Sequence, residues 1–161
     1  MRKIFASLLI ILPAYLILSL SFLDKDYFLC PIRYKSDIII RCDNYGEGFF
    51  AATRRGRRIH EGVDLMAEIG TPVLASRSGV VVSARKSHGM GNYIVIKHEG
   101  HLISIYGHLS ALFAAKNQLV RQGEVIGAVG KTGNANYRNI QPHLHFEIRK
   151  NGIPQDPLGY L

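Results

Sequence analysis

The stretch that best indicates the fold is His143-Leu144-His145-Phe146-Glu147-Ile148. Polar and apolar side chains alternate along it, which is typical of a β-strand with one buried face. Because residues i and i+2 of a strand point to the same side, both imidazoles are expected on one face, with Leu144 and Phe146 on the other. The stretch therefore predicts a strand that presents two histidines together.

Short runs of β-branched and aromatic residues recur after residue 70, and glycine or other turn residues separate them. This pattern predicts an all-β domain with a small antiparallel sheet, whose surface is expected to form the floor of a cleft. Only residues 111–116 are expected to be helical. The expected strands cover residues 80–83, 93–96, 102–106, 125–129 and 143–148, with a first strand at 37–41.

A second histidine motif lies far upstream of the first, in His60-Glu61-Gly62-Val63-Asp64, which has the form H-x-x-x-D. Two imidazoles and a carboxylate are a common ligand set for catalytic zinc, which keeps its fourth position for water. Gly62 allows the chain between His60 and Asp64 to turn tightly. The even separation would equally place both side chains on one face of an extended segment. Each motif alone is weak, but together they suggest a hydrolytic zinc site with one histidine left over.

The residues around both motifs form further blocks whose order along the chain is distinctive. The blocks are His60-Glu61-Gly62-Val63-Asp64-Leu65, Gly70-Thr71-Pro72-Val73, Ser78-Gly79-Val80-Val81, Gly91-Asn92-Tyr93-Ile94-Val95-Ile96-Lys97-His98, Tyr106-Gly107-His108-Leu109-Ser110, Gly123-Glu124-Val125-Ile126-Gly127, Gly130-Lys131-Thr132-Gly133 and Pro142-His143-Leu144-His145-Phe146-Glu147-Ile148-Arg149. This ordered set strongly resembles the catalytic domain of the lysostaphin-type (LytM-like) zinc metallopeptidases, which cut peptide cross-links in bacterial peptidoglycan. The resemblance covers roughly residues 47–157.

The resemblance implies a role for each of five residues and one Zn²⁺ per chain. His60, Asp64 and His145 would be the metal ligands. His108 and His143 would be catalytic histidines that orient or deprotonate the attacking water and stabilise the tetrahedral oxyanion. One segment departs from the family pattern, because residues 134–141 are longer and more polar than usual. This segment is expected to border the cleft, and it leaves the substrate preference open.

The remaining histidines receive simpler interpretations. His98 and His101 lie at hairpin-turn positions and are expected to have surface or structural roles. His88 precedes a glycine-rich turn and is expected to be exposed.

The N-terminus predicts export and a membrane anchor. Residues 4–23 contain no charged side chain and follow a basic start, Met1-Arg2-Lys3. A helix of about 20 residues spans about 30 Å, the hydrocarbon thickness of a bilayer. We interpret residues 1–23 as an uncleaved signal anchor or transmembrane helix, with a cleaved signal and secretion as the alternative. Residues 24–46 would be a linker and first strand, and 47–161 the peptidase domain on the outer side of the cytoplasmic membrane.

Cysteine and charge agree with the cell envelope. Cys30 and Cys42 would pair as a disulfide in an oxidising compartment, or remain two free thiols. The formal net charge is +8, with a basic cluster at residues 54–58. An exported chain does not meet the chromosome, so no nucleic-acid partner is expected. The cluster is either a solvated loop or a surface suited to the anionic wall or membrane headgroups.

The most specific functional hypothesis is a zinc endopeptidase whose partners are the stem or cross-link peptides of peptidoglycan. Two alternatives remain open. One is a non-catalytic LytM-like scaffold or activator of cell-wall amidases, and the other is a zinc peptidase with a protein substrate. The presence of all five expected site residues favours the enzyme.

Overall fold

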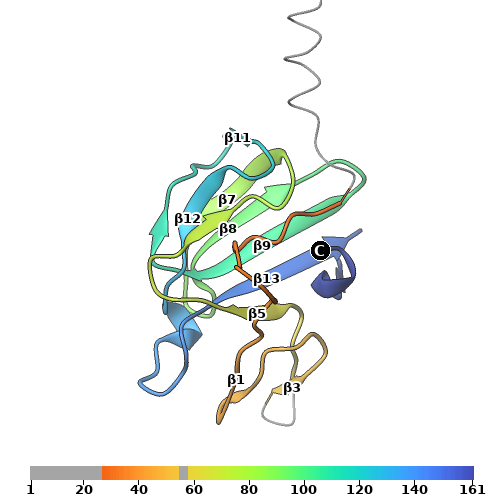
Figure 1. The fold of residues 1–161 in the computed structure, drawn as a ribbon. Coiled ribbons are helices and arrows are strands. Elements are labelled where there is room, and N and C mark those ends of the chain that lie inside the picture. The colour runs from red at the N-terminus through yellow and green to blue at the C-terminus, as the bar shows by residue number, and fades with distance from the viewer. Residues whose placement is uncertain (1–26, 55–57) are drawn as a thin grey trace, which may run out of the picture.

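The computed structural model describes residues 27–54 and 58–161, and nearly all of the regular structure in these ranges is β-strand (Figure 1). The main sheet is seven-stranded over these residues and antiparallel throughout. Its strands run in the order β11-β7-β8-β9-β13-β14, and β5 also pairs with β13. The bounds are β5 Val63–Met66, β7 Gly79–Ser87, β8 Gly91–Lys97, β9 Leu102–Leu109, β11 Leu119–Val120, β13 His143–Lys150 and β14 Ile153–Gln155.

A smaller antiparallel sheet and two short hairpins complete the β-structure. The small sheet has the order β10-β12-β6, and the hairpins are β1-β2 and β3-β4. Two single-turn 3₁₀ helices, η1 and η2, lie before β13 and at the C-terminus. The bounds are β1 Cys42–Asp43, β2 Gly46–Glu47, β3 Thr53–Arg54, β4 Arg58–Ile59, β6 Pro72–Leu74, β10 Ala111–Leu112, β12 Val125–Ala128, η1 Gly133–Ala135 and η2 Pro157–Gly159.

The hydrophobic core lies between the two sheets. The small sheet contributes Val73 and Ile126, and the main sheet contributes Ile94, Leu144 and Phe146 among others, all fully buried. The main-sheet strands alternate between core and opposite face, as their sequences predict. On β13, however, both faces are buried from His143 to Ile148, because the imidazole face is covered as well. The expectation of a half-exposed strand is therefore wrong for β13.

The five expected long strands are present, whereas two other local predictions are wrong. Residues 111–116 are not helical, because Ala111 and Leu112 pair with β12 as strand β10. Tertiary pairing overrides the weak helical preference of this alanine-containing run. The first strand is also shifted: residues 37–41 contribute only an isolated bridge from Ile40 to Leu65, and pairing begins at β1.

The segment before β1 is part of the packed domain. Phe28 and Ile32 are buried in the core, and the Leu29 amide donates to the Ser76 carbonyl oxygen at 2.8 Å. In the described part of the chain both cysteines, Cys30 and Cys42, are free thiols, so the disulfide alternative is not the one observed. The division of the chain at residues 23 and 46 stays a prediction.

No helix within residues 27–54 and 58–161 is long and apolar enough to span a membrane. The predicted anchor at residues 1–23 lies outside the described residues, as do residues 55–57 of the basic cluster.

Gly62 permits the close approach of β5 to β13. A Cβ atom at this position would lie 2.3 Å from the Phe146 carbonyl oxygen and 2.9 Å from Glu147 Cγ. The chain also bends at Gly62, as expected, and the close approach adds a steric reason for glycine, since any side chain would push the two strands apart.

Gly62→Ala should destabilise the protein by about 1–3 kcal/mol, the usual cost of overpacking a close contact. The measurement is urea unfolding of both proteins. Gly159→Ala is the matched control, because a Cβ there meets nothing within 4 Å and should leave stability unchanged. Equal stability of Gly62→Ala and the parent protein would contradict the steric role.

Candidate active site

The site is built on the pairing of β5 with β13, which places Asp64 directly opposite His145. His60 lies just before β5, and its Nδ1 is 2.8 Å from the Phe49 carbonyl oxygen. His60, Asp64 and His145 are all buried. The structure therefore brings together three residues that lie in two distant motifs of the sequence.

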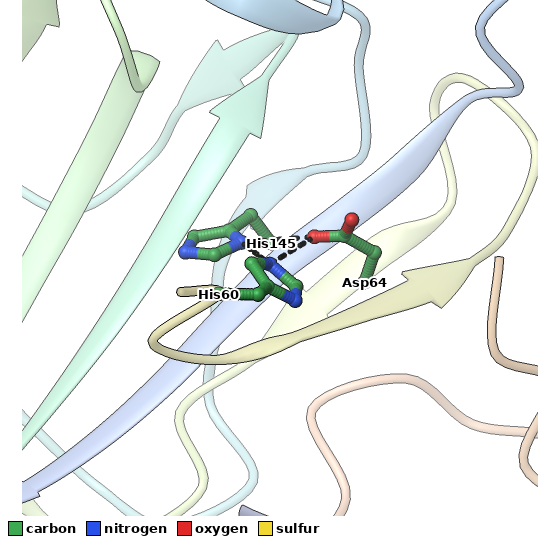
Figure 2. Close-up of side chains that lie close together, drawn as sticks. All are labelled: His60, Asp64 and His145. Atoms are coloured by element: carbon green, nitrogen blue, oxygen red, sulfur yellow. Dashed lines mark hydrogen bonds and ion pairs between the residues drawn. The ribbon is translucent and has the colours of Figure 1, made fainter. Parts of the chain in front are cut away.

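The three side chains converge on a common point (Figure 2). His145 Nδ1 lies 2.9 Å from Asp64 Oδ1, and His60 Nε2 lies 3.1 Å from the same oxygen. The two imidazole nitrogens are 3.0 Å apart. Ligand atoms at about 2.0–2.1 Å from a tetrahedral ion are separated by roughly 3.3 Å, so this triangle is close to the size that a small divalent ion requires.

The hydrogen bonds on the far side of each ring fix which nitrogen faces this point. His60 Nδ1 donates to the Phe49 carbonyl oxygen, which leaves the lone pair of Nε2 directed inward. His145 Nε2 donates to Glu147 Oε1 at 3.0 Å, which directs Nδ1 inward. Two nitrogens and a carboxylate oxygen thus meet within 3.1 Å and need either a proton or a cation between them. The donor set therefore fits a metal ion.

Charge interactions favour the same arrangement. Burial alone would raise the pKa of Asp64, but hydrogen bonds from His145 and His60 hold it well below its usual range. Burial alone would lower the pKa of His145, but hydrogen bonds to Asp64 and Glu147 raise it to about 9. At neutral pH without an ion, a proton on His145 therefore occupies the place that a metal ion would take.

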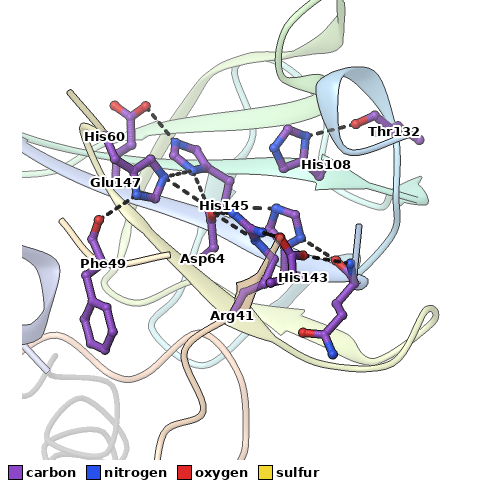
Figure 3. A network of polar contacts seen from close by, with 11 residues as sticks. Arg41, Phe49, His60, Asp64, His108, Thr132, His143, His145 and Glu147 are labelled. Atoms are coloured by element: carbon purple, nitrogen blue, oxygen red, sulfur yellow. Dashed lines mark hydrogen bonds and ion pairs between the residues drawn. The ribbon is translucent and has the colours of Figure 1, made fainter. Parts of the chain in front are cut away.

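Two further histidines stand beside this cluster (Figure 3). The rings of His108, on β9, and His143, on β13, have centroids 5.0 Å apart. His108 Nδ1 lies 2.9 Å from the Thr132 carbonyl oxygen, and His143 Nδ1 lies 2.7 Å from that of Gln141. Both rings therefore donate through Nδ1, which leaves Nε2 as the acceptor atom, and His143 Nε2 lies 3.8 Å from Asp64 Oδ1.

Both of these histidines are neutral at physiological pH. Burial, together with the nearby His145 and His143, lowers the pKa of His108 to about 3. Burial also lowers the pKa of His143, against the opposing effect of Asp64. Two unprotonated Nε2 atoms next to a metal-binding cluster can accept a proton or a hydrogen bond from a water molecule between them.

The backbone at His108 is unusual. Its φ of 62° lies in the left-handed region, which non-glycine residues rarely adopt. Such strain persists only where surrounding contacts enforce it, and it is concentrated at functional sites. Here the His108 amide donates to the Met90 carbonyl oxygen at 2.8 Å, which holds the residue in place.

The structure adds residues to the site that sequence reasoning missed. Glu147 accepts from His145, and Arg149 Nε in turn lies 2.7 Å from Glu147 Oε2. Arg41 contacts the second oxygen of Asp64 at 3.0 Å and Asp43 at 2.5 Å. Glu147 could have been inferred from its i+2 position next to His145, whereas no local signal identifies Arg41 or Asp43.

The histidines outside the site agree with the simpler interpretations. His98 is buried and bridges the Ser78 carbonyl oxygen and Ser104 Oγ, which is a structural role. His101 has a φ of 60° in the turn after β8, and His88 is exposed in the turn after β7.

An antiparallel β-domain with a buried His-Asp-His cluster beside two neutral histidines has the features of a metal-dependent hydrolase. Its sequence matches the model of Peptidase family M23 over residues 58–157, and the chain belongs to that family. This confirms the resemblance found in the sequence.

Individual relatives agree with the family. The DD-carboxypeptidase/endopeptidase Mpg of Neisseria meningitidis is 46% identical over 102 residues, which are 63% of this chain and 23% of that protein. The crystal structure of a zinc-containing peptidase from Vibrio cholerae superposes with a TM-score of 0.71 at 32% identity, covering 84% of this chain and 40% of the other. The catalytic domain of lysostaphin from Staphylococcus simulans superposes with a TM-score of 0.59 at 36% identity. The superposition covers 73% of this chain and 89% of the lysostaphin domain. The chain thus spans about a quarter of the length of the Neisseria relative.

Metal binding should release protons, because the ion displaces the proton held by His145. At pH 7 about one proton should leave per ion bound, since the pKa of His145 is about 9 in the metal-free protein. The apparent affinity should rise about tenfold per pH unit toward pH 9 and level off above it. Calorimetric titration with Zn²⁺ in buffers of different ionisation enthalpy measures the number of protons released per ion. A value near zero at pH 7 would contradict the assignment.

Proposed function

We propose that the protein is a zinc-dependent endopeptidase that hydrolyses peptide cross-links of bacterial peptidoglycan. The observation that carries the proposal is the convergence of two inward-facing imidazole nitrogens and one carboxylate oxygen within 3.1 Å. Membership of Peptidase family M23 and the zinc-containing peptidase among the similar structures support zinc as the ion. The name of the Neisseria relative supports endopeptidase chemistry on a bond flanked by D-amino acids.

In this proposal His60, Asp64 and His145 hold one Zn²⁺ per chain. When bound, zinc supplies the Lewis acidity that activates water at neutral pH and polarises the scissile carbonyl group. Asp64 contributes one negative charge to the ligand set, so the site keeps a net positive charge that favours a developing oxyanion. Glu147 holds the His145 ring through its Nε2 hydrogen, as carboxylates behind metal-bound histidines commonly do.

His108 and His143 would handle the proton. Each ring is fixed by an Nδ1 hydrogen bond to a backbone carbonyl oxygen, so each Nε2 is a ready acceptor. One Nε2 can take the proton of the attacking water and later deliver it to the leaving amine. Once protonated, the same N–H can stabilise negative charge on the tetrahedral carbon's oxygen. The structure keeps both rings neutral beforehand, which is the state that a base requires.

The substrate would lie across the imidazole face, and the polar segment 134–141 would border it. Most of this segment is exposed, including Tyr137 and Arg138. Either a D,D cross-link or an interpeptide bridge containing glycine is compatible with these features. Mass spectrometry of the muropeptides released by the purified protein distinguishes them.

Of the two alternatives, a non-catalytic activator of wall amidases is less well supported. Such a role needs no ligand set, whereas the proximity of His60, Asp64 and His145, and of the His108 and His143 rings beside them, supports the enzyme. A protein substrate would use the same chemistry, and only the released products separate it from the proposed function.

We also propose that residues 1–23 anchor the protein in the cytoplasmic membrane of the bacterial envelope, with the peptidase domain on the outer side. This proposal rests on the uncharged apolar run at residues 4–23 and its basic flank.

Substitutions within one strand should separate metal binding from proton transfer. His145→Ala should lose high-affinity zinc binding and, with it, hydrolysis of purified wall sacculi. His143→Ala and His108→Ala should keep zinc and lose activity by about 10²–10⁴-fold, the usual range for a general acid–base group. Metal content and muropeptide release are measured on the same preparations.

The control for these variants is His88→Ala, because His88 is exposed in a turn, whereas His98 is buried and hydrogen-bonded. The reverse pattern, in which His143→Ala loses zinc and His145→Ala keeps it, would exchange the two roles. Zinc and activity retained in all variants would refute the site.

The membrane anchor is tested by cell fractionation. The protein should stay with membranes in high salt, because burial of an apolar helix does not depend on ionic strength. Recovery of a shortened soluble form would show that the signal is cleaved.

A further inference from the structure

Arg41 is a buried cation that lies between two carboxylates at the edge of the site (Figure 3). Its Nη2 and Nε atoms lie 3.0 and 3.3 Å from Asp64 Oδ2, and its Nη1 lies 2.5 Å from Asp43 Oδ1. The two oxygens of Asp64 therefore have different partners: Oδ1 faces the histidines, and Oδ2 faces the guanidinium.

Asp43 continues this network toward the other end of the site. Its Oδ2 accepts from the Gln141 amide at 3.3 Å, and the Gln141 carbonyl oxygen in turn accepts from His143 Nδ1 at 2.7 Å. The rings of Tyr45 and Tyr137 stack alongside, with centroids 6.4 Å apart. The β1-β2 hairpin is thus joined to the segment before β13 by a hydrogen bond from the Gln141 amide to Asp43 and by the contact between Tyr45 and Tyr137.

We propose that Arg41 and Asp43 are positioning residues, which act on the site from its two ends. Arg41 holds the Asp64 carboxylate with Oδ1 directed at the metal position. Asp43 accepts from the Gln141 amide and so holds the backbone of Gln141, whose carbonyl oxygen fixes the His143 ring with Nε2 directed at the reacting groups. The role of Asp43 rests on the proposed function, because it concerns a catalytic histidine. The role of Arg41 rests on the geometry of the metal ligands alone.

The Asp64 carboxylate and the His143 ring can both rotate unless neighbouring groups hold them. A carboxylate with only one fixed oxygen can rotate about its Cβ–Cγ bond, and a metal ligand that rotates binds less tightly. The planar guanidinium prevents this because it reaches both carboxylates at fixed angles, which a single ammonium group does not do. The His143 ring likewise keeps its orientation only while the backbone oxygen at Gln141 stays in place.

A contribution to stability alone would be a weak explanation for this network. Buried ion pairs often add little net stability, because the attraction is offset by desolvation of both charges. A positioning role predicts effects on metal affinity and turnover that exceed any effect on unfolding.

The experiment compares Arg41→Ala, Arg41→Lys and Asp43→Ala in the full chain, with Glu47→Ala as control. Glu47 is an exposed carboxylate on the same hairpin, so its removal should change neither zinc binding nor activity. Four quantities are measured for each variant: the dissociation constant for Zn²⁺, kcat and KM on purified sacculi, and the unfolding midpoint.

Arg41→Ala should weaken zinc binding by about 10–100-fold, the usual effect of removing a group that orients a metal ligand. Arg41→Lys should restore only part of the zinc affinity, because an ammonium group keeps a cation next to Asp64 but does not hold the carboxylate at a fixed angle. Asp43→Ala should weaken zinc binding less than Arg41→Ala does, because Arg41 keeps its contacts with Asp64, and should lower kcat by about 10–100-fold with KM nearly constant.

A double variant separates positioning from general damage. If Asp43 acts through His143, Asp43→Ala should cause no further loss of kcat in the His143→Ala background. Independent, additive losses in that background would overturn the role of Asp43. Zinc affinity of Arg41→Ala equal to that of the parent protein would overturn the role of Arg41.

Failure of the proposed function gives a different result. In that case the parent protein itself would release no peptides from sacculi. The zinc measurements on the Arg41 variants would still decide whether Arg41 orients Asp64.

Discussion

Antiparallel pairing between β5 and β13 places Asp64 opposite His145, and the other contacts of the site depend on this pair. A shift of the register by one residue would turn every side chain of one strand to the opposite face. On the other side of β13, His145 pairs with Gly107 of β9, where an added Cβ would lie 3.3 Å from the His145 Cβ. Gly107 on β9 thus leaves room for the His145 side chain without interrupting the sheet.

The charges behind the metal-binding cluster are arranged symmetrically. Asp64 and Glu147 flank the His145 ring, and each carboxylate has an arginine on its far side, Arg41 for Asp64 and Arg149 for Glu147. Burial of so many charged groups costs free energy unless each one is paired. Because the pairs are complete, the carboxylates are held in fixed orientations before any ion or substrate arrives, which lowers the reorganisation needed during the reaction.

The five residues that the sequence proposes for the site do lie close together in the structure, and the sequence singled them out because their motifs are local and ordered distinctively along the chain. It also predicted the long strands, whose alternation follows directly from the burial of one face. It failed where a short segment takes its structure from a distant partner. Ala111 and Leu112 form a strand only because β12 lies beside them, and Arg41 joins the site only because the chain folds back across β5.

The role of Glu147 could be predicted from the sequence only in part. Its place next to His145 follows from the strand period, yet its function as a hydrogen-bond acceptor depends on which ring nitrogen faces inward. Ring orientation of this kind is decided by contacts such as that between His60 and the Phe49 carbonyl oxygen. Sequence patterns place side chains on a face, whereas the partners across the fold decide which atom of each side chain is available.

The packing of residues 27–41 has a practical consequence for recombinant fragments. The match to the family model begins at residue 58, yet Phe28 and Ile32 are buried in the core and Arg41 contacts Asp64. A fragment cut at the start of the matched region would expose apolar surface and leave Asp64 Oδ2 without its guanidinium partner. A fragment that preserves these contacts therefore starts well upstream of residue 58 and includes Phe28.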